Sequence, residues 1–129
     1  MPVSHIMIGS NDPAKSVAFY EAALAPCGYA KAFEMTGRVG FSCGQGQPPL
    51  LIGKPADGKP ATFGNGMMLG FVAESRARVR EAYEAGLKAG GKDEGKPGLR
   101  PEGPPNTYAA YLRDPAGNKL GIFCNKPSE

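Results

Sequence analysis

The sequence predicts an α+β protein made of two βαβββ modules, whose eight strands form one curled mixed sheet with the helices outside. Three observations predict this class: a short repeat, a capped helix in each copy, and the same strand order around each helix. The chain has 129 residues, which suits one domain or two small halves that share one core. We expect module 1 to span about residues 1–60 and module 2 about residues 61–129 of a single domain.

The repeat is Tyr20-Glu-Ala-Ala-Leu24, which recurs as Tyr83-Glu-Ala-Gly-Leu87. Each copy closes a segment whose apolar residues recur at helical spacing. Asp12 and Ser75 stand where each helix begins, and both residue types cap helix N-termini by accepting backbone hydrogen bonds. A match of five residues together with equivalent caps therefore favours an internal duplication.

Each helix is preceded by one short strand and followed by three. The expected strands are residues 5–8, 29–35, 39–43 and 50–53 in the first half, and 68–71, 92–96, 107–113 and 119–125 in the second half. The strand 92–96 is the weakest of these, and residues 95–106 form a Pro/Gly-rich insertion. Aligning the halves places His5 on Met68 and Leu51 on Gly121.

The last two strands form a β-hairpin through Asp114-Pro-Ala-Gly-Asn118, a sequence typical of a turn. If Arg113 and Lys119 flank the turn, Tyr111 stands across from Gly121 on the same face. Glycine inside a strand often marks the close approach of another group. An aromatic ring lying over such a glycine restores packing, so we expect Tyr111 to cover Gly121.

Composition excludes several classes of protein. The net charge is +3, and the basic residues are spread along the chain, so we expect no nucleic-acid partner. The apolar runs are too short to span a membrane, and the first residues lack signal-peptide architecture. Three cysteines without metal-ligand spacing are typical of reduced thiols, which favours a cytoplasmic location.

Four segments carry a resemblance to a known superfamily: Val-Ser-His at 3–5, Asn-Gly-x-x-Leu-Gly-Phe at 65–71, Gly-x-Pro-Gly-Leu-Arg-Pro at 95–101, and Tyr-x-x-Tyr-Leu-Arg-Asp-Pro-x-Gly-Asn-Lys-Leu at 108–120. In order and spacing they resemble the vicinal oxygen chelate superfamily, which includes glyoxalase I, bleomycin-resistance proteins and extradiol dioxygenases. The resemblance covers essentially the whole chain. It implies an open, curled sheet around a cup-shaped cavity, and a homodimer, because relatives bury exposed edges by dimerising.

The resemblance also implies positions for metal ligands. In the dioxygenase-like pattern a divalent metal is held by two histidines and one glutamate, and this chain has His5, Met68 and Gly121 at those positions. The fourth pseudo-symmetric position, near Leu51, is aliphatic. A thioether is a weak, soft donor and glycine offers none, so we expect no bound metal and no cofactor. The alternative is a divalent metal held by His5 and unrecognised donors, such as Glu102.

Three functions follow from this reading. The favoured one is a degenerate metal site whose cup binds a small organic molecule. The residues expected to line the cup are His5, Met68, Tyr111, Gly121, Leu51 and Arg100. The alternatives are a metal-dependent lyase or dioxygenase of the same superfamily, and a subunit with a vestigial pocket that acts through partner contacts. His5, Met68 and Tyr111 also have a purely structural interpretation, as a hydrogen-bonded histidine, flexible core filler and a core aromatic.

Overall fold

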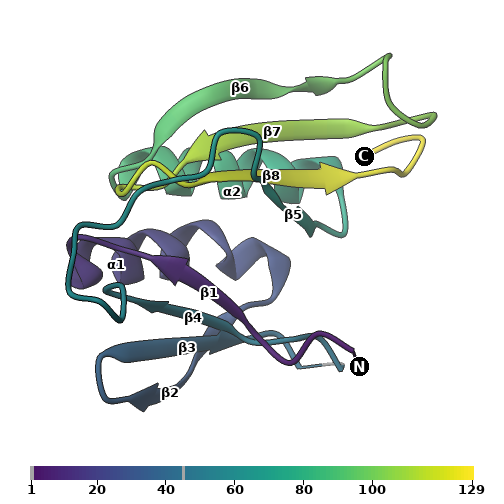
Figure 1. The fold of residues 1–129 in the computed structure, drawn as a ribbon. Helices are drawn as coiled ribbons and strands as arrows, with labels where there is room; N and C mark the ends of the chain where they lie inside the picture. Colours follow the sequence, from purple (N-terminus) through teal and green to yellow (C-terminus); the bar gives the residue numbers. More distant parts are fainter. Residues whose placement is uncertain (1, 45) are drawn as a thin grey trace.

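The computed structural model describes residues 2–44 and 46–129 (Figure 1). The first module contains β1 (Ile6–Gly9), α1 (Pro13–Ala23), the 3-10 helix η1 (Ala25–Cys27), β2 (Ala30–Met35), β3 (Arg38–Ser42) and β4 (Leu50–Gly53). The second contains β5 (Leu69–Val72), α2 (Arg76–Lys88), β6 (Lys92–Leu99), β7 (Tyr108–Arg113) and β8 (Lys119–Cys124). In the described part of the chain neither helix has the length and apolar character of a membrane span.

The predicted fold class, α+β with two βαβββ modules and eight strands, is confirmed. Hydrogen bonds divide the strands into two four-stranded sheets, in the orders β1-β4-β3-β2 and β5-β8-β7-β6. This division differs in detail from the expected continuous sheet, because β1 and β5 line a pocket where the modules meet and do not pair with each other. The curled arrangement therefore stays open at the junction of the modules.

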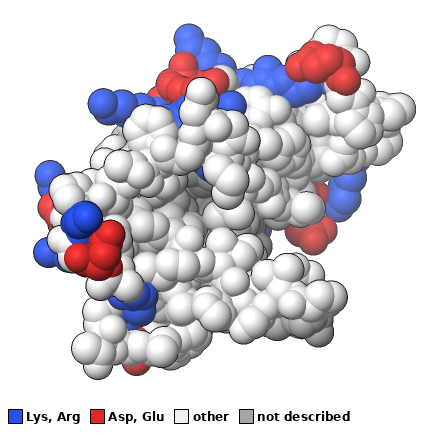
Figure 2. All heavy atoms as spheres, in the orientation of Figure 1, with Lys and Arg blue, Asp and Glu red and all other residues white. Residues whose placement is uncertain are grey.

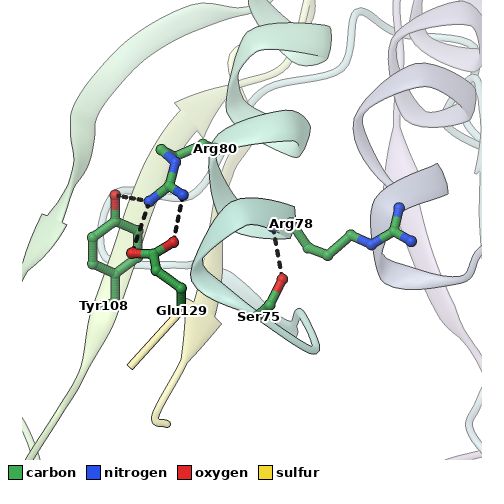
Figure 3. Close-up of polar contacts among 5 residues, drawn as sticks. All are labelled: Ser75, Arg78, Arg80, Tyr108 and Glu129. Atoms are coloured by element: carbon green, nitrogen blue, oxygen red, sulfur yellow. Dashed lines mark hydrogen bonds and ion pairs between the residues drawn. The ribbon is translucent and has the colours of Figure 1, made fainter. Parts of the chain in front are cut away.

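Both helices begin as their sequences predict. The Asp12 carboxylate accepts a hydrogen bond from the Lys15 backbone N–H at the start of α1. At the start of α2 the Ser75 hydroxyl oxygen accepts one from the backbone N–H of Arg78, at 3.1 Å (Figure 3). These bonds satisfy N–H groups that a helix leaves unpaired in its first turn.

The strand registers confirm how the halves align. Parallel pairing joins Met7 to Leu51 in module 1 and Gly70 to Gly121 in module 2, so Leu51 and Gly121 hold equivalent places. The antiparallel hairpin pairs Tyr111 with Gly121, as expected.

The sixth strand is present at the predicted place but extends further than expected, into the segment that we assigned to the insertion. β6 continues from Lys92 to Leu99, and its pairing with β7 shifts register around Gly95. β6 is an edge strand of its sheet, and such a strand tolerates Pro97, which has no backbone N–H to donate. The irregular pairing hides the alternation from which a strand is recognised.

One core joins the modules. Helices α1 and α2 pack against each other, and α2 also packs on β6, β7 and β8. Alternation divides the residues of β8 between the two faces of its sheet: Leu120, Ile122 and Cys124 belong to the core. Gly121 and Phe123 therefore lie on the face that the helix does not cover, which is the face expected to form the cup.

A buried polar network also links the modules. The Tyr20 hydroxyl of α1 donates to Asp114 at 2.6 Å, and the Asn118 side-chain amide donates to both Asp114 and the Gly9 carbonyl oxygen of β1, each at 2.9 Å. The other Asp114 oxygen accepts from the backbone N–H groups of Ala116 and Asn118. Burial, and then the adjacent Asp114 carboxylate, raise the pKa of Tyr20 well above its usual value. The turn before β8 is thereby fixed against module 1.

Candidate ligand-binding site

A pocket of about 200 Å³ lies where the two modules meet. It is bounded by β1, by the starts of β5 and β8, and by the segment that connects the modules. Its lining residues are Ile6, Met7, Ile8, Gly9, Tyr20, Thr62, Phe63, Gly64, Met67, Met68, Leu69, Asn118 and Lys119. On the face shown in Figure 2 the middle of the molecule is hollowed and mostly uncharged, and the charged side chains gather towards its margins.

The pocket wall is rich in methionine and exposed apolar surface. Met7, Met67 and Met68 are 40%, 68% and 41% exposed, and Phe63 is 52% exposed. Clustered apolar exposure of this kind marks binding surfaces more often than scattered single residues do. The alternative reading of Met67 and Met68 as core filler is therefore wrong.

Lys119 contributes a positive charge to the pocket lining. Among the described residues, Lys119 is the only charged side chain that lines the pocket. It is the first residue of β8 and immediately precedes Leu120, which pairs with Leu69. Because Met68 precedes Leu69 in the same way, Lys119 and Met68 lie at the same end of the adjacent strands β8 and β5. The Lys119 ammonium nitrogen lies 5.2 Å from the centre of the Tyr111 ring.

Beyond Lys119, two aromatic rings cover a pair of glycines. A Cβ atom at Gly121 would lie 2.6 Å from Cε1 of Phe123 and 3.2 Å from Cδ1 of Tyr111. A Cβ atom at Gly70 would lie 3.2 Å from the same Phe123 ring. The two rings meet edge to face with centroids 5.7 Å apart. Phe123 was missed by sequence reasoning, although its position two residues after Gly121 places it on the same face.

The predicted site residues do not all come together. Met68 lines the pocket, whereas Tyr111 and Gly121 pair with each other outside its lining. Leu51 pairs with Met7 and is 9% exposed. His5 is exposed, lies just before β1, and shares a hydrogen bond of 2.9 Å with the Ser4 hydroxyl, outside the pocket lining.

Arg100 was expected to reach over the mouth of the cup. Its guanidinium instead donates to the carbonyl oxygens of Lys96 and Ala109 and lies 5.2 Å from the centre of the Tyr111 ring. It lines a separate depression next to the Pro-rich loop. Arg100 thus packs against Tyr111 and does not line the pocket between the modules.

Tyr108 lies on the other face of the sheet from Arg113, as alternation predicts. Arg80 of α2 donates to the Tyr108 hydroxyl at 3.2 Å and pairs with the Glu129 carboxylate (Figure 3). This hydrogen bond to Arg80 lowers the pKa of Glu129. Tyr108 is therefore a part of the helix side of the sheet and takes no part in the cup.

The Cys27 thiol in η1 is a poor nucleophile. Burial raises the pKa of Cys27 to about 11, so this thiol stays protonated at neutral pH. Burial and a hydrogen bond with Cys43 raise the pKa of the neighbouring Tyr29 to about 12. Cys124 is buried in the core.

The fold and the site define a class of protein: paired βαβββ modules with a pocket at the junction of the modules. The Glyoxalase/Bleomycin resistance protein/Dioxygenase superfamily model matches residues 3–122, and the chain belongs to this superfamily.

Solved structures agree with this assignment. A glyoxalase/bleomycin resistance protein from Albidiferax ferrireducens T118 is 36% identical, with a TM-score of 0.84 over 95% of this chain and 98% of that one. A glyoxalase-related enzyme from Fulvimarina pelagi is 20% identical, with a TM-score of 0.75 over 94% and 86% of the two chains. Lactoylglutathione lyase from Agrobacterium tumefaciens is 22% identical, with a TM-score of 0.64 over 94% and 91%, and shares the fold. No curated protein matches the chain.

Proposed function

We propose that this protein binds a small organic molecule in the pocket between its modules, and that it does so without a catalytic metal. The observation that carries the proposal is the composition of the pocket: an apolar, methionine-rich wall with a single cation. Small-molecule sites are typically concave and mostly apolar, with a few polar groups that orient the ligand. A catalytic site would need several convergent acid, base or metal-ligating groups.

The residues at the superfamily's ligand positions do not fit a divalent metal. Met68 offers a thioether where the resemblance implies an imidazole, and thioethers suit soft ions such as Cu(I). At Gly121 the place of a carboxylate side chain is filled by the rings of Phe123 and Tyr111. No group of three His, Cys, Asp or Glu side chains comes together within residues 2–44 and 46–129.

We also propose that the protein acts as a homodimer in the cytoplasm. The strands β2 and β6 are unpaired edges of their sheets, and Met35, Val72 and Leu99 are 56%, 75% and 57% exposed. Exposed edges and apolar side chains of this kind are commonly covered by a second subunit. The three free cysteines support a reducing compartment. Sedimentation equilibrium tests the dimer, and a monomer at micromolar concentration would refute it.

Binding of a neutral aromatic probe, 2-naphthamide, tests the main proposal. The chain contains no Trp, so naphthalene fluorescence can be followed without interference from indole. We expect saturable 1:1 binding that Met68→Asp weakens at least about tenfold, because a carboxylate would be desolvated in the pocket. Val3→Asp is the matched control: Val3 is an apolar residue that is 51% exposed and does not line the pocket.

Elemental analysis of protein purified without chelators tests the second part. We expect less than stoichiometric Fe, Ni, Zn and Mn. A stoichiometric divalent metal would overturn the proposal and favour a metal-dependent lyase or dioxygenase.

A further inference from the structure

We infer that the ligand of this pocket is a small organic anion, with its flat apolar body against the methionine wall and its negative group on Lys119. This inference rests on the proposed function and deepens it by naming the chemical class of the ligand. It follows from the charges and hydrogen bonds around the pocket.

Lys119 is a cation without an ionic partner. It makes no ion pair with a carboxylate in the described part of the chain, and its ammonium group lies against the Tyr111 ring. Its neighbour across the hairpin, Arg113, is in a different situation: Arg113 pairs with Glu94 at 3.0 Å and donates to the Gly117 carbonyl oxygen at 3.1 Å. Of the two cations that flank the hairpin turn, Lys119 is therefore the one whose charge remains available, and it is the one that lines the pocket.

The Asn118 amide and the Tyr20 hydroxyl of the wall already have partners, whereas the uncharged hydroxyl of Thr62 has none among the described residues. The Asn118 side-chain amide donates to Asp114 and Gly9, and the Tyr20 hydroxyl donates to Asp114. Asp114 in turn accepts four hydrogen bonds and is not part of the lining. Because these donors occupy the Asp114 carboxylate, Asp114 does not pair with Lys119. The Lys119 ammonium therefore stays free for an incoming anion.

The apolar part of the wall indicates the rest of the molecule. Met7, Met67 and Met68 are flexible and polarisable, and sulfur makes favourable contacts with aromatic rings. Phe63 adds an aromatic face. A pocket of about 200 Å³ is smaller than those of drug-sized ligands, so it suits one or two fused rings with a single charged substituent.

A pair of probes with matched shape tests the charge preference. The carboxylate 2-naphthoate and the amide 2-naphthamide differ by one charge, and both are titrated by fluorescence anisotropy. We expect naphthoate to bind about tenfold more tightly, the size of one charge-assisted hydrogen bond at a partly exposed site. Lys119→Met should remove this preference, so that the two probes bind the variant with equal affinity. Raising the salt concentration should weaken naphthoate alone.

Lys126→Met is the control variant, since Lys126 pairs with Glu74 at the surface, outside the pocket lining. It should leave both affinities unchanged. Equal binding of the two probes by the unmodified protein, or an unaltered preference in Lys119→Met, would overturn the anion inference while the proposed binding function stands. Failure of both probes to bind would overturn the proposed function and the inference with it.

Discussion

The two glycines beneath Phe123 allow a quantitative test of the packing beside the pocket. Replacing Gly121 with Ala would place a Cβ atom 2.6 Å from Cε1 and 3.0 Å from Cζ of Phe123, whereas carbon atoms in contact are normally about 3.5–4.0 Å apart. The backbone at Gly121 is not in the left-handed region, so the strain arises from side-chain contacts: chiefly this one, with a smaller contribution from Cδ1 of Tyr111 at 3.2 Å. The ring would have to move outward by roughly 1 Å.

The size of the destabilisation by Gly121→Ala follows from the contacts that the Phe123 ring loses when it moves. Its edge-to-face contact with Tyr111 is worth about 0.5–1.5 kcal/mol, and a displaced rotamer costs about 0.5–1.5 kcal/mol. Against this, alanine restricts the unfolded chain and stabilises by about 0.4–1 kcal/mol. We therefore expect Gly121→Ala to lower the free energy of unfolding by about 1 kcal/mol.

Urea unfolding followed by circular dichroism measures this quantity in a double-mutant cycle. Phe123→Leu removes the two ring atoms that obstruct the new methyl group, so in that background Gly121→Ala should stabilise the protein by about 0.4–1 kcal/mol. The change of sign is the decisive feature. The same effect of Gly121→Ala in both backgrounds would show that Phe123 does not occupy this space.

Three further predictions concern the metal positions and the buried groups. The triple variant Met68→His, Gly121→Glu and Phe123→Ala, in which the last change makes room, should bind Zn²⁺ together with the imidazole of His5. Calorimetry measures this binding. No binding would show that the strand alignment does not bring these positions together. Tyr20→Phe should destabilise by about 1.5–3 kcal/mol in urea unfolding, because it removes a buried hydrogen bond to a carboxylate. The Tyr20 pKa is raised in the folded state, so the contribution of Tyr20 to the free energy of unfolding is complete below about pH 10 and declines above it. Above about pH 10 the Tyr20→Phe variant should therefore lose stability less steeply than the unmodified protein. An equal slope for both proteins would contradict the raised pKa of Tyr20. The Cys27 pKa is raised from 9.0 to about 11, so the contribution of Cys27 to the free energy of unfolding is present below pH 9 and is lost as the pH rises to about 11. Cys27→Ala should therefore flatten the dependence of the free energy of unfolding on pH between these values. The same dependence in both proteins would refute the burial of the thiol.

The elements that local signals specify could be predicted from the sequence. The caps Asp12 and Ser75 lie within three residues of the N–H groups that they satisfy, so composition alone indicates where each helix begins. The hairpin turn fixes the register that follows it, which is why the pairing of Tyr111 with Gly121 was predictable. The end of β6 lacked such a signal. Pro97 is typical of a loop, and the irregular pairing of β6 with β7 hides the alternation of a strand.

Much of the candidate site depends on contacts that are distant in sequence. Phe63 and Met67 belong to the segment connecting the modules, and no periodicity indicates that they line the same pocket as Lys119. The resemblance instead directed the prediction to the superfamily's metal positions. Of these, Met68 lines the pocket, whereas His5, Leu51 and Gly121 lie outside its lining. Phe123 could have been found from strand alternation, but its ring over Gly70 and Gly121 depends on the folded geometry.

The carboxylate that joins the modules has a consequence for how the chain can be divided. Asp114 belongs to the second half, yet its carboxylate accepts a hydrogen bond from the Tyr20 hydroxyl of the first half. The Asn118 amide likewise donates to the backbone of β1. A polypeptide cut between Gly53 and Leu69 would leave each fragment with an unsatisfied acid, phenol or carbonyl group and a bare helix surface. The fragments should therefore be unstructured when separate and should regain their native form only when mixed. The two copies have become halves of one cooperative unit despite their likeness.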